Sequence, residues 1–248
     1  MNLLAGWREA RERRRIAARR RVLREYYSWA HLWLPSRPTF RQFRVAVDRA
    51  GGRARFLKID DRIRDPETLR RWLLRLAPSH VYFTTSRWLD PQRLGPRDLR
   101  RRRAGYPIAH NVLLGQELYF DIDAPGDLEG AKEDASALLG FLNGEGFRDL
   151  ALVYSGNKGF HVHAYDFEPR FLPRLPEDPR KREAAVQAAR ADLVARIVSA
   201  GIGIDVEVTM DPRRILRLPG TVHGKTFNIC EFVDPAGLAR FQPHHIPQ

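Results

Sequence analysis

The chain has 248 residues, and 43 Lys and Arg against 30 Asp and Glu give it a formal net charge of +13. This length suffices for one large domain or two small, closely packed ones. So basic a balance favours a polyanionic partner, usually nucleic acid, with an acidic membrane surface as the alternative. No apolar run reaches the roughly 18 residues of a membrane helix, and the amino terminus lacks the apolar core of a signal peptide. We therefore expect a soluble, cytoplasmic protein without a membrane partner.

Cys230 is the single cysteine of the chain. One cysteine excludes an internal disulfide and any zinc site built on several thiolates. No structural zinc is therefore expected.

The first predicted element is a long helix over residues 6–34, which Pro35 ends. Its first half is crowded with Arg8, Arg11, Arg13, Arg14, Arg15, Arg19, Arg20, Arg21 and Arg24. Its second half carries Tyr26, Tyr27, Trp29, Leu32 and Trp33. One interpretation is an arginine-rich grip on phosphates followed by a docking face. The other, simpler for the first dozen residues, is a solvated basic helix end.

Strands are predicted over residues 41–47 and 53–59, joined by a hairpin turn. Asp65 and Pro66 then predict a helix start, and residues 80–84 a further strand. Residues 87–112 are predicted as a long loop that carries Arg97, Arg100, Arg101, Arg102 and Arg103. A loop of this length is usually functional or disordered, so nucleic-acid contact and simple solvation both stay open.

Residues 118–124 alternate apolar and polar side chains, which predicts a half-buried strand. The apolar side chains point into a core, and the opposite face carries Tyr119, Asp121 and Asp123. Two carboxylates this close repel each other, and a shared divalent cation removes the repulsion. A solvated acidic strand end is the alternative, and this stretch alone does not decide between them.

Helices and strands continue to interleave in the rest of the chain. One helix begins at the cap Asp127 and ends near Gly144, and another buries Val186, Leu193, Val194, Ile197 and Val198 and ends at Gly201. Strands are predicted over residues 150–154, 160–165, 204–209, 215–218 and 227–232. Residues 169–179 form a proline-rich loop. This alternation predicts an α/β or α+β class.

A glycine-bracketed turn lies between two of these strands, at residues 155–159. Its glycines allow backbone N–H groups to converge on an anion, Ser155 adds a hydroxyl and Lys158 a positive charge. His161 follows on the polar face of the next strand, with His163 and Tyr165. A triphosphate suits such a pocket, and an ordinary hairpin turn is the alternative.

Two later stretches supply further charges. Residues 203–209 repeat the strand alternation with Asp205 and Glu207 on one face, so a third carboxylate could complete a site for two metal ions about 3.5–4 Å apart. A surface strand with two acids is the alternative. Residues 214–226 present Arg217, His223 and Lys225, which are donors that can neutralise phosphate, although a basic turn alone is more often only solvated.

Together these stretches resemble the catalytic small subunit of archaeal and eukaryotic DNA primases, within the archaeo-eukaryotic primase superfamily. The first motif of that family, a strand ending Asp-x-Asp, is matched by Asp121 and Asp123. The second, Ser-Gly-x-x-Gly-x-His, is matched by residues 155–161. The third, an aspartate followed by Arg/Lys-Leu-Pro-x-Ser-x-His-x-Lys-Thr, is matched by Asp205 and residues 217–226.

The resemblance implies a fold and a domain organisation. It implies an α/β (α+β) primase-type core, in which an RRM-like antiparallel sheet lies beside a second α/β layer, preceded by the basic and aromatic helix of residues 1–34. Residues 35–248 would be a single catalytic domain, with an α/β unit at about 35–112 and an RRM-like catalytic unit at about 113–232.

The resemblance also implies a site and an activity. Two Mg²⁺ or Mn²⁺ ions would be held by Asp121, Asp123 and Asp205. The incoming NTP or dNTP would be bound by Ser155, Gly156, Lys158, Gly159, His161, Arg217, His223 and Lys225. The implied activity is nucleotidyl transfer that makes RNA or DNA primers on a single-stranded DNA template, with a primase large subunit as a family partner.

Two departures from the family bear on this interpretation. The single cysteine excludes the Cys/His zinc knuckle that cellular members commonly carry, and Asn157 stands where many relatives have a basic residue. A compact primase-polymerase is therefore included. Three alternatives stay open: an end-joining repair polymerase that extends primers, a non-catalytic nucleic-acid-binding module, and a metal-dependent nuclease that uses Asp121, Asp123, His161 and His163.

Overall fold

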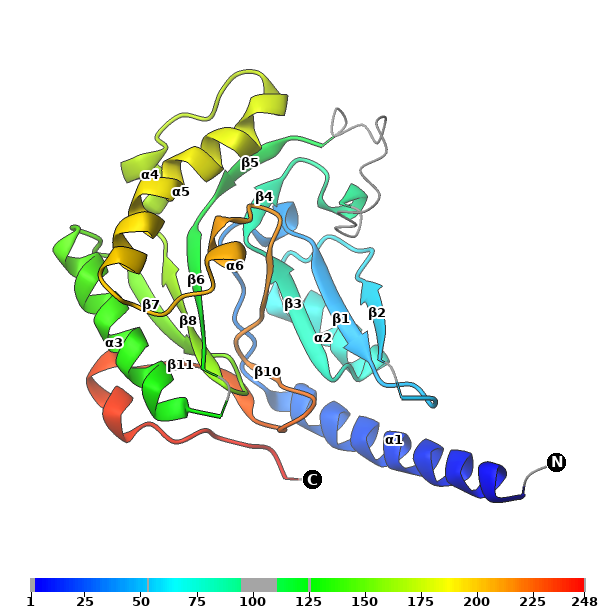
Figure 1. Ribbon diagram of the computed structural model, residues 1–248. Coiled ribbons are helices and arrows are strands. Elements are labelled where there is room, and N and C mark those ends of the chain that lie inside the picture. Colours follow the sequence, from blue (N-terminus) through cyan, green and yellow to red (C-terminus); the bar gives the residue numbers. More distant parts are fainter. Residues whose placement is uncertain (1–2, 53, 95–110, 125, 248) are drawn as a thin grey trace.

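The structure is a computed structural model that describes residues 3–52, 54–94, 111–124 and 126–247. The five arginines predicted on the long loop, from Arg97 to Arg103, lie outside these residues. The described residues form a mixed α/β fold with two larger antiparallel sheets and one two-stranded sheet, and helix α1 (Leu3–Trp29) projects from the body (Figure 1). Within the described residues, no helix is both long and apolar enough to span a bilayer.

The first sheet has the strand order β2-β1-β3-β9, with every neighbouring pair antiparallel. Its strands are β1 (Phe43–Val47), β2 (Arg55–Lys58), β3 (His80–Thr84) and β9 (Ile215–Arg217). Helix α2 (Pro66–Leu76) packs against α1 and starts at the predicted cap, because the Asp65 carboxylate accepts a hydrogen bond of 2.7 Å from the Thr68 N–H. Since β9 comes from late in the chain, its pairing with β3 joins the two halves of the protein.

The second sheet has the order β10-β11-β7-β8-β6, also antiparallel. Its strands are β6 (Leu118–Asp123), β7 (Leu150–Tyr154), β8 (Gly159–Ala164), β10 (Thr221–Val222) and β11 (Ile229–Val233). The helices α3 (Leu128–Gly144) and α5 (Arg182–Ser199) lie on one side of it (Figure 1). The short pair β4 (Ser86–Trp88) and β5 (Leu113–Gln116) leads into β6.

Short helical segments complete the described chain. Two are the α-helices α4 (Phe167–Phe171) and α6 (Val206–Met210). The others are the 3-10 turns at Pro38–Phe40, Pro91–Arg93, Pro179–Lys181 and Pro235–Arg240.

Both faces of β8, in the second sheet, are buried, which differs from the half-buried strand that the alternation predicts. The apolar side chains of β6 point into a core, as predicted, and there they pack with residues of α3 and α5. The opposite face packs toward the first sheet: Tyr119 belongs to the core of that sheet, and His163 is fully buried. Trp33 fills the junction, with its ring 5.7 Å from that of Phe83 and 5.9 Å from that of His163. On this face of β6, Tyr119 is buried against the first sheet, Asp121 is half-buried and only Asp123, at the end of the strand, is exposed.

The alternation of residues 204–209 predicts a strand, and this prediction is wrong: these residues form a loop and most of the helix α6. The Asp205 carboxylate accepts a hydrogen bond of 2.9 Å from the Val208 N–H, and the Thr209 N–H donates to the Asp205 carbonyl at 3.0 Å. Aspartate at this position favours a helix start. Three other predictions differ from the structure. Helix α1 ends at Trp29 rather than at residue 34, and part of α4 lies in the predicted proline-rich loop. Val198 of α5, predicted to be buried, is exposed.

The single cysteine lies in the second sheet. Cys230 is fully buried on β11 opposite Thr221 of β10, and burial raises the pKa of its thiol to about 12. It is therefore a protonated, apolar core residue.

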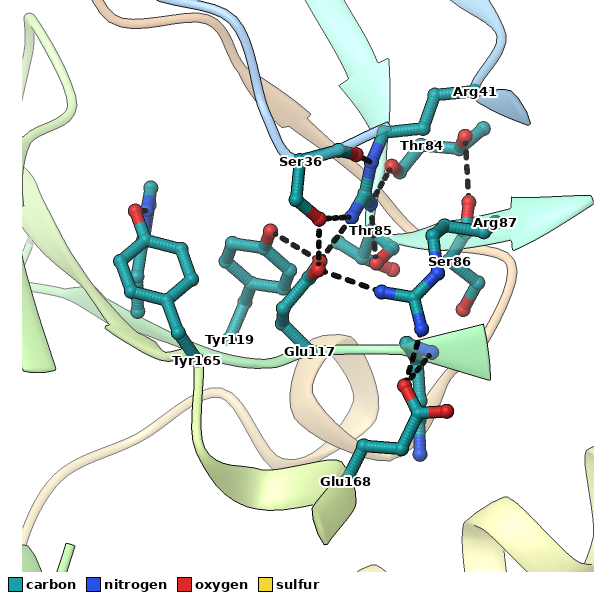
Figure 2. Close-up of polar contacts among 12 residues, drawn as sticks. Ser36, Arg41, Thr84, Thr85, Ser86, Arg87, Glu117, Tyr119, Tyr165 and Glu168 are labelled. Atoms are coloured by element: carbon teal, nitrogen blue, oxygen red, sulfur yellow. Dashed lines mark hydrogen bonds and ion pairs between the residues drawn. The ribbon is translucent and has the colours of Figure 1, made fainter. Parts of the chain in front are cut away.

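A buried ionic network joins the two halves of the fold (Figure 2). The Glu117 carboxylate, just before β6, pairs with the buried Arg41 and lies 2.9 Å from the guanidinium of Arg87. It also accepts hydrogen bonds from the hydroxyls of Ser36 and, at 2.9 Å, Tyr119. Burial alone would raise the pKa of Glu117, but Arg41, Ser36 and Arg87 together hold that pKa below its ordinary value. Arg41 also donates hydrogen bonds to the carbonyls of Thr84, the last residue of β3, and of Thr85, which follows it.

We predict that Glu117→Gln lowers the free energy of unfolding by about 3–5 kcal/mol, because it leaves the Arg41 charge buried without its counter-ion. Urea unfolding followed by circular dichroism measures this. The control is Glu67→Gln, which breaks the exposed pair with Arg70 and is expected to cost less than about 1 kcal/mol. Equal small losses for the two variants would show that the Arg41–Glu117 pair does not hold the halves together.

Candidate active site

Three aspartates meet at one end of the second sheet. Asp121 and Asp123 leave the last residues of β6, and the Asp205 N–H donates a hydrogen bond of 2.8 Å to the Asp121 carbonyl. This backbone bond brings the start of α6 directly beside β6. The structure therefore places the three predicted metal ligands together, although Asp205 reaches the site from a helix cap and not from a strand.

A buried arginine fixes α6 in this position. Arg190 of α5 is almost fully buried and donates a hydrogen bond of 2.6 Å to the carbonyl of Thr209, at the end of α6. Its other terminal nitrogen bonds to the side chain of Gln116 on β5. One guanidinium thus spans α5, α6 and the entry to β6.

The three carboxylates strain one another electrostatically. Burial, followed by the charges of Asp123 and Asp205, raises the pKa of Asp121 to about 7, against the opposing effects of Arg214 and Lys158. A group of negative charges held this close favours a cation between them. The scaffold therefore keeps an arrangement that is unfavourable without a counter-charge.

Side chains of the protein already contact two of these carboxylates. The Lys158 ammonium lies 2.9 Å from the Asp123 carboxylate, and His161 Nε2 lies 3.6 Å from Asp121 Oδ1. The Asp205 carboxylate is used by the helix cap. Accordingly, no group of three or more His, Cys, Asp or Glu in the described parts of the chain is already arranged as a metal cage. The donor chemistry nevertheless fits Mg²⁺ or Mn²⁺, because both prefer carboxylate oxygens.

The predicted anion-binding turn needs its glycines for close approach. Gly156 has φ +88, and a Cβ there would lie 2.8 Å from the Cβ of His223. A Cβ on Gly159 would lie 1.7 Å from the Ile122 carbonyl oxygen of β6. The Thr226 hydroxyl donates to the Gly156 carbonyl at 2.6 Å. The turn is therefore wedged between β6 and the basic segment, which an ordinary exposed hairpin turn would not be.

Arg217 links the two sheets beside this turn. From β9, its Nε donates a hydrogen bond of 2.8 Å to the Ser155 carbonyl, and its Nη1 lies 2.6 Å from Nδ1 of His80. The guanidinium also lies over the ring of Tyr82, 5.1 Å from its centroid. The ring of His80 contacts that of His223 edge-on at 4.8 Å.

The histidines of the site are neutral in the ligand-free protein. Burial, followed by the charge of Arg217, lowers the pKa values of His80, His161 and His223 to about 3. They therefore offer hydrogen bonds but no charge, and Arg214 and Lys158 are the cations whose charges act on Asp121. Lys225, two residues after His223, is exposed.

The positions of two histidines, His80 and His163, differ from what the sequence predicts. His80 joins the site although sequence reasoning missed it, because only the pairing of β3 with β9 brings it to Arg217. His163, which the nuclease alternative needs, is sealed between the sheets, where Nδ1 bonds to the Tyr165 hydroxyl at 3.0 Å. It does not line the carboxylate site.

We predict that Asp121→Asn stabilises the metal-free protein at about pH 8 and not at about pH 4. The folded protein binds the Asp121 proton more tightly than the unfolded chain, so stability present below the ordinary pKa of 3.8 is lost as pH rises toward about 7. The full effect is on the order of 4 kcal/mol. Thermal unfolding in EDTA measures it, with the exposed Asp60→Asn as the control. A variant less stable than the parent at about pH 8 would contradict the crowding of charges.

Comparisons with known proteins agree with this geometry. The DNA primase small subunit family matches residues 120–235, which hold all three aspartates and both turns. The chain is 31% identical over 205 residues to the DNA primase small subunit PriS of Pyrobaculum calidifontis, covering 64% of this chain and 61% of that protein. It is 25% identical over 248 residues to PriS of Sulfurisphaera tokodaii, covering 81% of this chain and 72% of that one.

A solved structure, the polymerase domain of Mycobacterium tuberculosis Ligase D in complex with DNA, aligns with a TM-score of 0.46 at 15% identity. The alignment covers 82% of this chain and 67% of that one. The chain spans about 61% of the length of the curated relatives it first matches. By sequence, the chain is thus similar to the DNA primase small subunit family over residues 120–235 and to several PriS proteins.

Proposed function

We propose that the protein is a template-directed nucleotidyltransferase that makes or extends primers on single-stranded DNA with a divalent metal. The observation that carries this proposal is the meeting of Asp121, Asp123 and Asp205 opposite Lys158 and Arg217. The matched family segment contains all five. Carboxylates for cations on one side and cations for phosphates on the other are the two halves of a phosphoryl-transfer site.

The three aspartates would hold two Mg²⁺ or Mn²⁺ ions. Ions held by these carboxylates would supply the positive charge that activates an attacking 3′-hydroxyl and neutralises a leaving pyrophosphate. In that arrangement Lys158 exchanges the Asp123 carboxylate for a phosphate oxygen of the incoming NTP or dNTP. Arg217 and Lys225 neutralise the remaining charge of the triphosphate, and the backbone of residues 156–159 approaches it closely because the turn carries glycine.

The remaining predicted contacts are hydrogen bonds. Ser155 and His223 lie on the two turns that Arg217 and Thr226 hold together, so both can face one ligand. His161, beside Asp121, would orient that carboxylate or contact a phosphate. Neutral imidazoles suit this role, because they donate without adding charge to a site that Arg217 already makes basic.

We propose that residues 35–248 act as one catalytic domain. Both sheets contribute to the site, and the Glu117 network ties them together. A primase large subunit is the partner that similarity to this family suggests, and a cytoplasmic location fits this role. The nuclease alternative loses support because His163 is sealed in the core.

The activity test supplies single-stranded template, Mn²⁺ or Mg²⁺ and labelled NTPs or dNTPs, with and without a primer. New oligomers without primer indicate priming, extension that requires primer indicates a repair-type polymerase, and shortening of the template indicates a nuclease. We expect Asp121→Ala to abolish synthesis and to leave template binding largely unchanged, because phosphate contacts come from other residues. Normal synthesis by this variant would refute the metal assignment.

Lys158→Gln is predicted to move two affinities in opposite directions. Loss of a charged hydrogen bond to phosphate weakens nucleotide binding, with an increase in KM of about tenfold or more. Without nucleotide, Mn²⁺ binding tightens, because the ammonium no longer competes for the Asp123 carboxylate. Titration calorimetry with Mn²⁺ and steady-state extension kinetics measure the two effects. The exposed Lys181→Gln is the control, and a loss of both affinities would contradict the exchange of partners.

A further inference from the structure

A basic groove runs along α1, outside the site described above. It encloses about 630 Å³ between the helix and the turn that links β1 to β2. Four arginines line it, Arg13, Arg20, Arg24 and Arg49, together with the acids Glu9 and Asp48. The groove therefore keeps an excess of positive charge.

The acids of the groove are already paired within the protein. Glu9 accepts a hydrogen bond of 2.7 Å from Arg13 one helical turn away. Asp48 lies 3.4 Å from Nε of Arg19 and accepts a hydrogen bond of 2.8 Å from the Ser79 hydroxyl. Further exposed arginines lie on other sides of the same helix: Arg8, Arg11, Arg14, Arg15 and Arg21. An anionic ligand would consequently meet mainly guanidinium groups.

The helix is anchored to the body of the protein rather than being a loose basic end. Arg20 donates a hydrogen bond of 2.9 Å to the Asp48 carbonyl, and Arg24 donates one of 3.0 Å to the Leu74 carbonyl. The buried Tyr27 hydroxyl donates to the Pro78 carbonyl at 3.2 Å. These contacts hold α1, and with it Arg20 and Arg24, against the body of the protein.

One residue connects the groove with the candidate active site. Arg19 donates a hydrogen bond to the carbonyl of Gly224, which stands between His223 and Lys225, and its guanidinium lies 4.8 Å from the ring centroid of Phe227. Arg20 of the groove is the next residue of the helix. The basic surface therefore continues from the triphosphate side of the site along α1.

We propose that the α1 groove binds the sugar–phosphate backbone of a single nucleic-acid strand and guides it past the active site. The identity of that strand as template rests on the proposed function, whereas the binding itself does not. Guanidinium groups on a fixed helix suit phosphates, and the exposed Trp7 near the helix end offers a ring on which a base can stack. Arginines lie on several sides of the helix without a continuous apolar face, which a membrane-surface helix would need.

The length of the surface sets the length of strand required. Arg8 and Arg24 are separated by about 24 Å along the helix axis, at 1.5 Å a residue. A short oligonucleotide therefore covers either the active site or the groove, and a longer one covers both. Affinity is expected to rise with length until both are occupied.

The test compares two full-length triple variants that lose the same charge. The groove variant is Arg13→Gln, Arg24→Gln and Arg49→Gln, and the control is Arg174→Gln, Arg180→Gln and Lys181→Gln, exposed residues near the start of α5. Fluorescence anisotropy of a labelled oligothymidylate, titrated at several salt concentrations, measures binding. We expect the groove variant to bind about tenfold or more weakly at low salt and its salt dependence, log K against log salt, to fall by about 2. The control is expected to stay within about twofold of the parent.

Three results would overturn the inference: unchanged binding by the groove variant, an equal loss by the control, or an α1-dependent affinity for phosphatidylserine vesicles without one for the oligonucleotide. Circular dichroism and thermal unfolding verify that both variants fold. The same titrations on Asp121→Asn separate this inference from the proposed function. A groove effect that persists while no form of the protein makes oligomers refutes the function alone, and synthesis with no groove effect refutes the groove alone.

Discussion

The mutual repulsion of three carboxylates at the end of β6 is the constraint on which the rest of the structure depends. Burial, followed by the charges of Asp123 and Asp205, raises the pKa of Asp121, and this shift expresses the cost of the arrangement. The surrounding fold maintains it through contacts that are themselves buried. The Asp205 N–H is bonded to β6, Arg190 holds α6 from behind, and Glu117 ties the start of β6 to the other sheet. Buried contacts beside the three carboxylates thus offset the unfavourable free energy of holding them together.

The site belongs to neither sheet alone. The second sheet supplies the aspartates of β6 and the glycine turn, whereas Arg217 arrives on β9, which pairs with β3 of the first. His80 enters through that same pairing. A nucleotide held between Lys158 and Arg217 would consequently touch both layers, so the alignment of the layers determines the geometry of the site.

Sequence reasoning predicts the local parts of this arrangement well. The cap at Asp65, the strand that ends in Asp121 and Asp123, and the glycine turn all follow from patterns within a few residues. It fails where a distant partner decides. Alternation in residues 203–209 resembles a strand, but Asp205 caps a helix whose position is set by Arg190. The second face of β8 looks polar because of its histidines, yet the first sheet covers it.

The lone thiol of the chain gives access to the motions of this region. Cys230 is buried opposite Thr221, which lies on the strand that leads directly into the His223 turn, and its sulfur lies 3.9 Å from the Arg217 carbonyl oxygen. In the closed sheet the sulfur is neither exposed nor ionised, and reagents that attack thiolates have no target. Alkylation of the native protein would therefore proceed only as often as this part of the sheet opens. Its rate would report how often the sheet opens beside Arg217 and the His223 turn.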